Sequence, residues 1–301
     1  SYGRTEGRGH YDYPEGYVHM NFYTARLEIN NLGGYCDAGI DGGCTDKSGD
    51  YLPDDGKDEW DRKLYNMEQE ILYFKDIGTV RPVGCVAISG KPCTPIRVDL
   101  KVEVAAGSDY RPNNGEYLNG WGKSERFGQI NMGGREGTDF SEANPDTNEA
   151  TLIFTLMNRV GRVPLEEGTV KFFSFTYFDF DKAKDDNGGQ ECVEILEPAA
   201  DRYDGQAAIS NGSVIYDYQP GDSVSVSDGV SGKKFCAKSV GTKFDNPSAP
   251  ADIHNRTEVK DQAVTLEFHN THVMKVKYSV ACCIGSGRNF VFAGAPVPLA
   301  N

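Results

Sequence analysis

The sequence lacks the segments and the charge that several classes of protein require. It has no run of 18 consecutive apolar residues, so it contains no predicted membrane-spanning helix. Positive charge is scarce, because 31 Lys and Arg residues stand against 45 Asp and Glu residues, for a formal net charge of −14. A chain this acidic is not expected to bind nucleic acid by neutralising phosphates.

The usual signatures of catalysis and metal binding are also missing. There is no G-x-S-x-G nucleophile elbow, no H-E-x-x-H zinc motif and no C-x-x-C pair. The run Gly120-Trp-Gly-Lys-Ser124 resembles the end of a phosphate-binding loop, but Tyr117 stands where that motif requires glycine. No nucleophile or acid pair can be selected from the sequence. We therefore assign no catalytic residue and predict that the chain is not an enzyme.

What the sequence does contain is an even number of cysteines, which favours disulfides. Two pairs each enclose seven residues and predict short disulfide-pinned loops, Cys36–Cys44 and Cys85–Cys93. The adjacent Cys282 and Cys283 leave several arrangements open: a vicinal disulfide, pairing with Cys192 and Cys236, or a crosslink between subunits. Among these we favour a Cys192–Cys236 bond.

Two N-glycosylation sequons add to the disulfide signal, one at Asn211 and one at Asn255. Covalent glycans and disulfides both belong to the secretory pathway, so we expect a secreted protein, extracellular or at the cell surface. The chain starts at Ser1 without a methionine, as expected of a processed mature chain.

The pattern of the remaining sequence predicts an all-β protein. The segment 96–104 alternates strictly, with apolar residues facing a core and Arg97, Asp99, Lys101 and Glu103 facing water. Further strands are expected near 151–157, 170–180, 191–196, 213–218, 234–240, 262–269, 273–281 and 288–293. The 35 glycines and 14 prolines suit the turns between them. We predict an antiparallel β-sandwich of jelly-roll type with an extended N-terminal arm.

Three regions are expected along the chain: an extended arm and strand at 1–29, a disulfide-pinned loop region at 30–70 with a short helix at 59–73, and the sandwich at 71–301. The arm begins with Gly, Tyr and charged residues, which do not form a core by themselves. The apolar alternation in 17–29 changes phase, which predicts a bulge or a change of buried face. We expect this arm to assemble with a neighbouring subunit through Tyr11, Tyr13, Val18, Met20 and Phe22.

Two groups of residues are candidate ligand sites. Asp179, Asp181 and Asp185 lie at the end of a predicted strand and could supply oxygen ligands to a structural calcium ion, the alternative being that they cap a solvated turn. Tyr110, Tyr117 and Trp121 lie among asparagines in a polar loop and could stack on sugar rings, the alternative being that they cover the edge of the sandwich.

A series of motifs in fixed order resembles an uncharacterised secreted β-domain family of dinoflagellates and other microalgae. The series is Asp76-Ile-Gly-Thr-Val80, Val98-Asp-Leu100, Phe127-Gly-Gln-Ile-Asn131, Phe175-Thr-Tyr-Phe-Asp-Phe-Asp181, Asp245-Asn-Pro247, Ala263-Val-Thr-Leu-Glu-Phe268 and Gly287-Arg-Asn-Phe-Val-Phe-Ala-Gly294. The resemblance covers residues 71 to 294 and implies a secreted β fold without implying catalytic residues. An N-terminal arm ahead of one jelly roll is also similar to the protomers of glycosylated helical fibrils from fresh water.

These observations lead to two functional hypotheses. The first is a structural protomer of a secreted, glycosylated filament, whose partners are copies of itself joined by the N-terminal arm. The second is a cell-surface carbohydrate-binding module that uses the aromatic residues of the polar loop, with calcium as a potential cofactor.

Overall fold

The structure of the chain is a computed structural model. It describes residues 14–22, 25–32, 70–84, 93–108, 110, 119–121, 127–132, 148–182, 190–196, 217–230, 232–242, 244, 246–281 and 288–294. Predictions on other residues lie outside this part of the chain.

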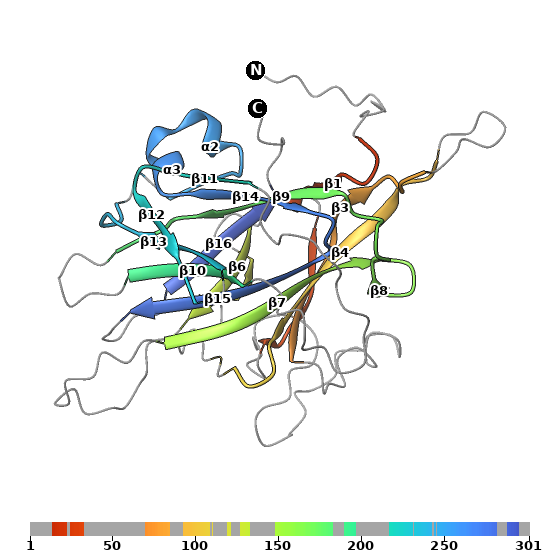
Figure 1. Ribbon diagram of the computed structural model, residues 1–301, viewed down its shortest axis with the longest axis horizontal. Coiled ribbons are helices and arrows are strands. Elements are labelled where there is room, and N and C mark those ends of the chain that lie inside the picture. Colours follow the sequence, from red (N-terminus) through yellow and green to blue (C-terminus); the bar gives the residue numbers. More distant parts are fainter. Residues whose placement is uncertain are drawn as a thin grey trace, which may run out of the picture.

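The described strands form two sheets that face each other (Figure 1). Every pairing between named strands is antiparallel. The ten-stranded sheet has the order β1-β3-β4-β7-β15-β10-β13-β12, with β2 also paired to β3 and β8 to β7. Its strands are β1 (Val18–Met20), β2 (Arg26–Asn30), β3 (Ile71–Val80), β4 (Ile96–Val104), β7 (Asn148–Asn158), β8 (Val163–Pro164), β10 (Gln190–Leu196), β12 (Val224–Asp228), β13 (Gly232–Ala237) and β15 (Val273–Ala281).

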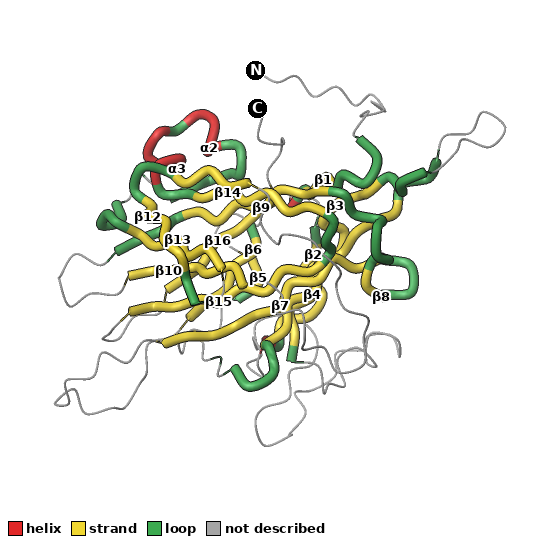
Figure 2. The backbone as a smooth tube through the Cα atoms, viewed as in Figure 1, coloured by secondary structure: helices red, strands yellow, loops and turns green. Residues whose placement is uncertain are grey.

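The second sheet has six strands in the order β11-β14-β9-β16-β6-β5. They are β5 (Gly120–Trp121), β6 (Gly128–Met132), β9 (Phe172–Phe178), β11 (Asp217–Pro220), β14 (Val264–His269) and β16 (Arg288–Gly294). Two short helices, α2 (Asp252–Asn255) and α3 (Thr257–Asp261), lie together beside β12 and β14, as Figure 2 shows. The predicted all-β class with antiparallel sheets is confirmed.

The core lies between the two sheets and is centred on the ring of Phe292 in β16. This ring is fully buried and contacts aromatic side chains of both sheets. The ring centroid of Phe175 in β9 lies 5.1 Å away, that of Phe154 in β7 5.5 Å, and that of Phe22 5.8 Å. Gly128 in β6 faces this ring, and a Cβ there would come within 2.2 Å of it. Aromatic packing around one side chain therefore joins the two layers.

The edge of the ten-stranded sheet explains the phase change in the N-terminal alternation. β1 and β2 both pair with β3, β1 with residues 78–80 and β2 with residues 72–75. Between these two contacts β3 carries a bulge, where Asp76 has a φ of 60°. The predicted single strand is therefore two strands that flank the bulge.

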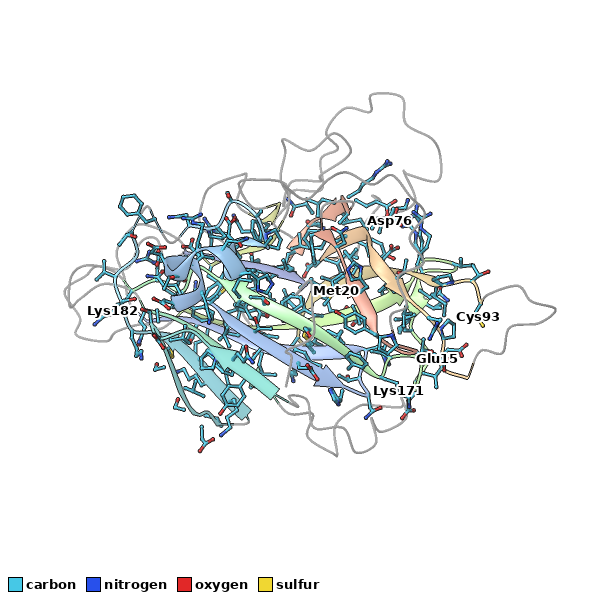
Figure 3. The ribbon with its side chains drawn as sticks, turned by 90° about the horizontal axis from the view of Figure 1, so that it is seen from above. Glu15, Met20, Asp76, Cys93, Lys171 and Lys182 are labelled. Atoms are coloured by element: carbon cyan, nitrogen blue, oxygen red, sulfur yellow. A yellow bond between two sulfur atoms is a disulfide. The ribbon has the colours of Figure 1, made fainter. Side chains whose placement is uncertain are left out.

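β1 also reaches the other sheet, so it lies between the two layers. Tyr17 forms a bridge with Phe172 at the start of β9, and the two rings lie 4.7 Å apart. Two glycines make room for this segment: a Cβ on Gly78 would meet the backbone of His19 at 2.1 Å, and one on Gly294 would meet Met20 at 2.2 Å. In Figure 3, Met20 lies near the middle of the molecule.

This position places three of the predicted assembly residues in the core. Val18, Met20 and Phe22 are at most 3% exposed and belong to the core of their own chain, so in the single chain they are not free for a neighbour. Residues 17–22 and 25–30 are accordingly part of the sandwich rather than a separate arm. Tyr11 and Tyr13 lie outside the described residues.

Two predicted strands agree with the structure to the residue. The segments 96–104 and 273–281 are β4 and β15. The helix predicted over 59–73 is wrong at 71–73, because these residues begin β3. The strands at 128–132 and 224–228 were not expected, because each is only five residues long and has only two apolar side chains.

Replacing Phe292 with alanine tests the central role of its ring. We expect the free energy of unfolding to fall by about 3–5 kcal/mol, because the change opens a cavity between the sheets. Val230→Ala is the control and should change stability by less than about 0.5 kcal/mol, since Val230 is 93% exposed. Urea unfolding followed by tryptophan fluorescence measures the free energy of unfolding of both variants. Equal stability of the two variants would contradict the central role of the Phe292 ring.

Candidate functional site

Carboxylates gather where β9 ends and β10 begins. Glu191 in β10 is 3% exposed, and its Oε2 accepts a hydrogen bond of 3.0 Å from the backbone N–H of Asp181. Arg288 in β16 lies on the other side, with Nε 3.9 Å from Glu191 Oε1. Asp179 has a φ of 64°, a left-handed conformation that is uncommon outside glycine. Lys182 marks this end of the molecule in Figure 3, far from Glu15 and Lys171.

The environment of Glu191 favours its neutral form. Burial raises the pKa of Glu191 well above its ordinary value, and the nearby charges of Asp181 and Asp179 raise it further. The hydrogen bond from Asp181 and the charge of Arg288 act in the opposite direction and do not cancel these effects. The group can therefore hold a proton at a pH where a free glutamate has lost it.

The structure describes two of the three residues of the predicted calcium site. Asp179 and Asp181 lie beside Glu191, while Asp185 is outside the described residues. Within the described part of the chain, no group of three or more His, Cys, Asp or Glu side chains has an arrangement that would hold a metal ion. Calcium binding stays a prediction.

Of the three predicted sugar-binding aromatics, the structure describes the side chain of Tyr110. Tyr110 is 4% exposed and packs in the core, which corrects its assignment as a stacking face. Its hydroxyl donates to the backbone carbonyl of Asn131 at 2.7 Å and lies 2.9 Å from Oδ1 of Asn119. A buried tyrosine needs such partners for its hydroxyl, and the side chain of Asn119 supplies one of them. Tyr117 and the side chain of Trp121 lie outside the described residues.

One disulfide prediction is confirmed. Cys192 and Cys236 face each other across β10 and β13 and form a disulfide, with their Cα atoms 4.1 Å apart. Cys93 is also disulfide-bonded. Its predicted partner Cys85, and the further cysteines Cys36, Cys44, Cys282 and Cys283, lie outside the described residues. The Cys192–Cys236 bond fits an oxidising compartment, such as the cell surface or the exterior.

The sequon at Asn255 is accessible. Asn255 ends α2 on the surface, and its side-chain amide donates to the carbonyl of Ala251 at 3.1 Å. Asn211 lies outside the described residues, so glycosylation of both stays a prediction. In the part of the chain that the structure describes, neither helix has the length and hydropathy needed to cross a membrane.

A polar network on the outer face of the ten-stranded sheet was missed by the sequence pattern. Asp99 was expected to face water but is 1% exposed. Its Oδ2 accepts a hydrogen bond of 3.0 Å from the hydroxyl of Tyr73, and its Oδ1 accepts one of 2.7 Å from the backbone N–H of Asp76. Burial raises the pKa values of both Asp99 and Tyr73. Asp99 therefore holds the β3 bulge in place.

Asp76 completes this network through its side chain. It forms ion pairs with Arg159 and with Arg97, the latter at 2.6 Å. Burial by itself would raise the pKa of Asp76, but these two arginines hold it below its ordinary value. Alternation alone could not reveal the network, since Asp76 and Asp99 meet only when β3 and β4 pair.

Comparison with known proteins gives weak matches. No family model and no curated protein matches the chain. Among solved structures, the N-terminal domain of the Streptococcus gordonii adhesin Sgo0707 is similar with a TM-score of 0.39 and 12% identity, over 74% of this chain and 46% of that one. The adhesin domain of PrgB from Enterococcus faecalis bound to DNA has a TM-score of 0.38 and 11% identity, over 74% of this chain and 66% of that one. This chain thus spans less than half the length of the first, and no function is transferred from either protein.

Glu191→Gln tests the electrostatics of the carboxylate cluster. Because the pKa of Glu191 is raised in the folded state, the unfolded state ionises first, so the wild-type free energy of unfolding falls as pH rises above about 4.5. Glutamine keeps the acceptor for Asp181 and cannot ionise. Urea unfolding at pH 4.5 and pH 8 should show the variant gaining stability relative to wild type at the higher pH. If the difference in stability between the variant and wild type is the same at pH 4.5 and at pH 8, the raised pKa of Glu191 is contradicted.

Proposed function

We propose that the chain is a non-enzymatic structural protomer of a secreted extracellular filament, in which the N-terminal strand of one subunit fills the slot of the next. The observation that carries this proposal is the position of β1. It is a three-residue strand close to the start of the chain, and it lies in a slot lined by glycines of both sheets.

The slot holds the N-terminal segment by backbone hydrogen bonds and apolar contacts. Gly16 donates to the carbonyl of Arg81 at 2.8 Å and accepts from the N–H of Lys171 at 2.8 Å. Tyr17, Val18 and Met20 are at most 3% exposed there. Contacts of this kind combine affinity from the backbone with specificity from alternate side chains.

The same contacts would form if the segment came from a second copy of the chain. Exchange of an identical element between protomers is therefore a low-cost route to assembly. β2 is a separate strand, so it can stay paired with its own β3 while β1 moves to a neighbour. Exchange in one direction only leaves a free segment at one end and an open slot at the other, and this produces a filament instead of a closed dimer.

The surface charge supports the same arrangement. With a net charge of −14, contacts between exposed faces of two copies would bring like charges together. The slot avoids this cost because its buried side chains are almost all apolar. Secretion is supported by the disulfide and by the exposed sequon at Asn255.

Cysteine crosslinking between β1 and β3 tests the proposal. His19 and Thr79 face each other in the pairing of these strands, and Thr79 is exposed. Chains carrying both His19→Cys and Thr79→Cys are oxidised and separated on a non-reducing gel. Exchange predicts a ladder of covalent oligomers, whereas pairing within one chain produces only an internal bond. A mixture of the two single variants should also produce a covalent dimer.

The matched control carries His19→Cys together with Val230→Cys in place of Thr79→Cys. Val230 is also exposed, but it is not paired with β1. This control should form no ladder. Electron microscopy of negatively stained wild-type protein shows whether filaments are present in the same sample. Filaments without crosslinked oligomers would reject strand exchange, and the absence of both would reject the filament.

A further inference from the structure

A groove on the outer face of the ten-stranded sheet has the size of a ligand site. It has a volume of about 570 Å³, within the usual range of about 300–1,000 Å³ for small-molecule pockets. It crosses β3, β4 and β7, where paired residues bring Ile71 beside Glu103 and Tyr73 beside Lys101. Pro164 of β8 pairs with Met157 and closes one side.

The floor of the groove is apolar. Ile71, Tyr73 and Met157 are each at most 6% exposed and form a small cluster with Ile29, separate from the main core. The hydroxyl of Tyr73 is bonded to Asp99 at 3.0 Å, so its position is fixed from below. The guanidinium of Arg162 lies over the Tyr73 ring, 5.5 Å from the ring centroid. This floor is rigid because its side chains are anchored on paired strands.

The rim carries charges of both signs in equal number. Lys101 and Arg162 are the cations among the lining residues, and Glu70 and Glu103 are the carboxylates. Lys101 lies 2.9 Å from Glu103, and Arg162 lies 2.9 Å from Glu28 next to the groove. Glu28 also pairs with Lys75 at 3.3 Å, so the charges beside the groove balance as well, and a ligand with net charge of either sign would meet as much repulsion as attraction here.

We propose that this groove binds a neutral saccharide of one to three sugar units. Sugar rings present apolar C–H faces, which match the apolar floor of Ile71 and Met157 beside the Tyr73 ring that Arg162 covers. Their hydroxyl groups both donate and accept, which matches paired carboxylates and cations in charge-assisted hydrogen bonds. None of the residues that line the groove belongs to the loop first considered for sugar binding, and the proposal does not rest on filament assembly.

Methyl resonances of methionine locate binding directly. Full-length protein labelled with ¹³C at the methionine methyl groups is titrated with neutral methyl glycosides and neutral oligosaccharides of two or three units. We expect one or more of these probes to shift the Met157 signal. The signal of Met274 should not move, because this residue is 2% exposed in the main core. Sialic acid and glucuronic acid serve as the charged comparison and should bind at least about tenfold more weakly.

Two lysine variants provide a matched pair. Lys101→Ala removes a donor from the rim and should weaken saccharide binding about tenfold, as expected for the loss of one charge-assisted hydrogen bond. Lys233→Ala removes a lysine from the ion pair with Asp228 on β12 and β13, outside the groove, and should leave the affinity unchanged. Arg162→Ala should weaken binding as well, with the thermal midpoint measured for each variant to verify folding.

Three results would overturn the proposal: no shift of Met157 with any neutral saccharide at 10 mM, binding of charged sugars alone, or equal affinity of the Lys101→Ala and Lys233→Ala variants. The first rejects a ligand of this class, the second rejects the role of the balanced rim, and the third places the saccharide elsewhere on the protein.

Discussion

The packing of aromatic rings around Phe292 is the interaction on which the rest of the structure depends. Phe292 belongs to the six-stranded sheet, and Phe154 brings the other sheet against it. Phe22, which follows β1, completes the cluster from the N-terminal segment, so this segment is drawn between the layers by the same hydrophobic contact. Gly78 and Gly294 are required because a Cβ at Gly78 would meet the backbone of β1 and a Cβ at Gly294 would meet the side chain of Met20. The slot proposed for assembly is thus a consequence of how the core is filled.

The bulge in β3 has a second set of consequences. It interrupts the edge strand, so the N-terminal segment pairs as two short strands instead of one long one. It also turns the backbone N–H of Asp76 toward the buried carboxylate of Asp99, which in turn holds the hydroxyl of Tyr73. Tyr73 is part of the floor of the outer groove. The bulge in β3 that divides the N-terminal segment into two strands therefore also fixes the position of a residue in the candidate ligand site. Residues of β3 therefore contribute both to the slot between the sheets and to the groove on the outer face of the ten-stranded sheet.

Much of the strand pattern could be predicted because alternation is a local property. In 96–104 each apolar residue is followed by a polar one, and β4 has these bounds. The Cys192–Cys236 bond was one of several arrangements compatible with the cysteine spacing, and it is set by the register of β10 and β13. Tyr110 shows the limit of such arguments: tyrosine beside asparagines suits a sugar site and a buried hydrogen-bonded ring equally well, and only the fold distinguishes them. Asp99 is a second example. Its place in an alternating strand predicts a side chain that faces water, but pairing with β3 buries it against Tyr73 and Asp76.

By itself, the sequence determined the all-β class, the acidity, the positions of the most regular strands and the absence of the catalytic motifs searched for. These properties follow from composition and from periodicity within single segments. The tertiary structure decided which side of each sheet is covered, where the N-terminal segment lies and which charges meet. Glu191, Asp181 and Arg288 come from separate strands or strand ends and acquire their electrostatic character only on burial together. Contacts between segments distant along the chain depend on register and layer packing, which no local pattern encodes.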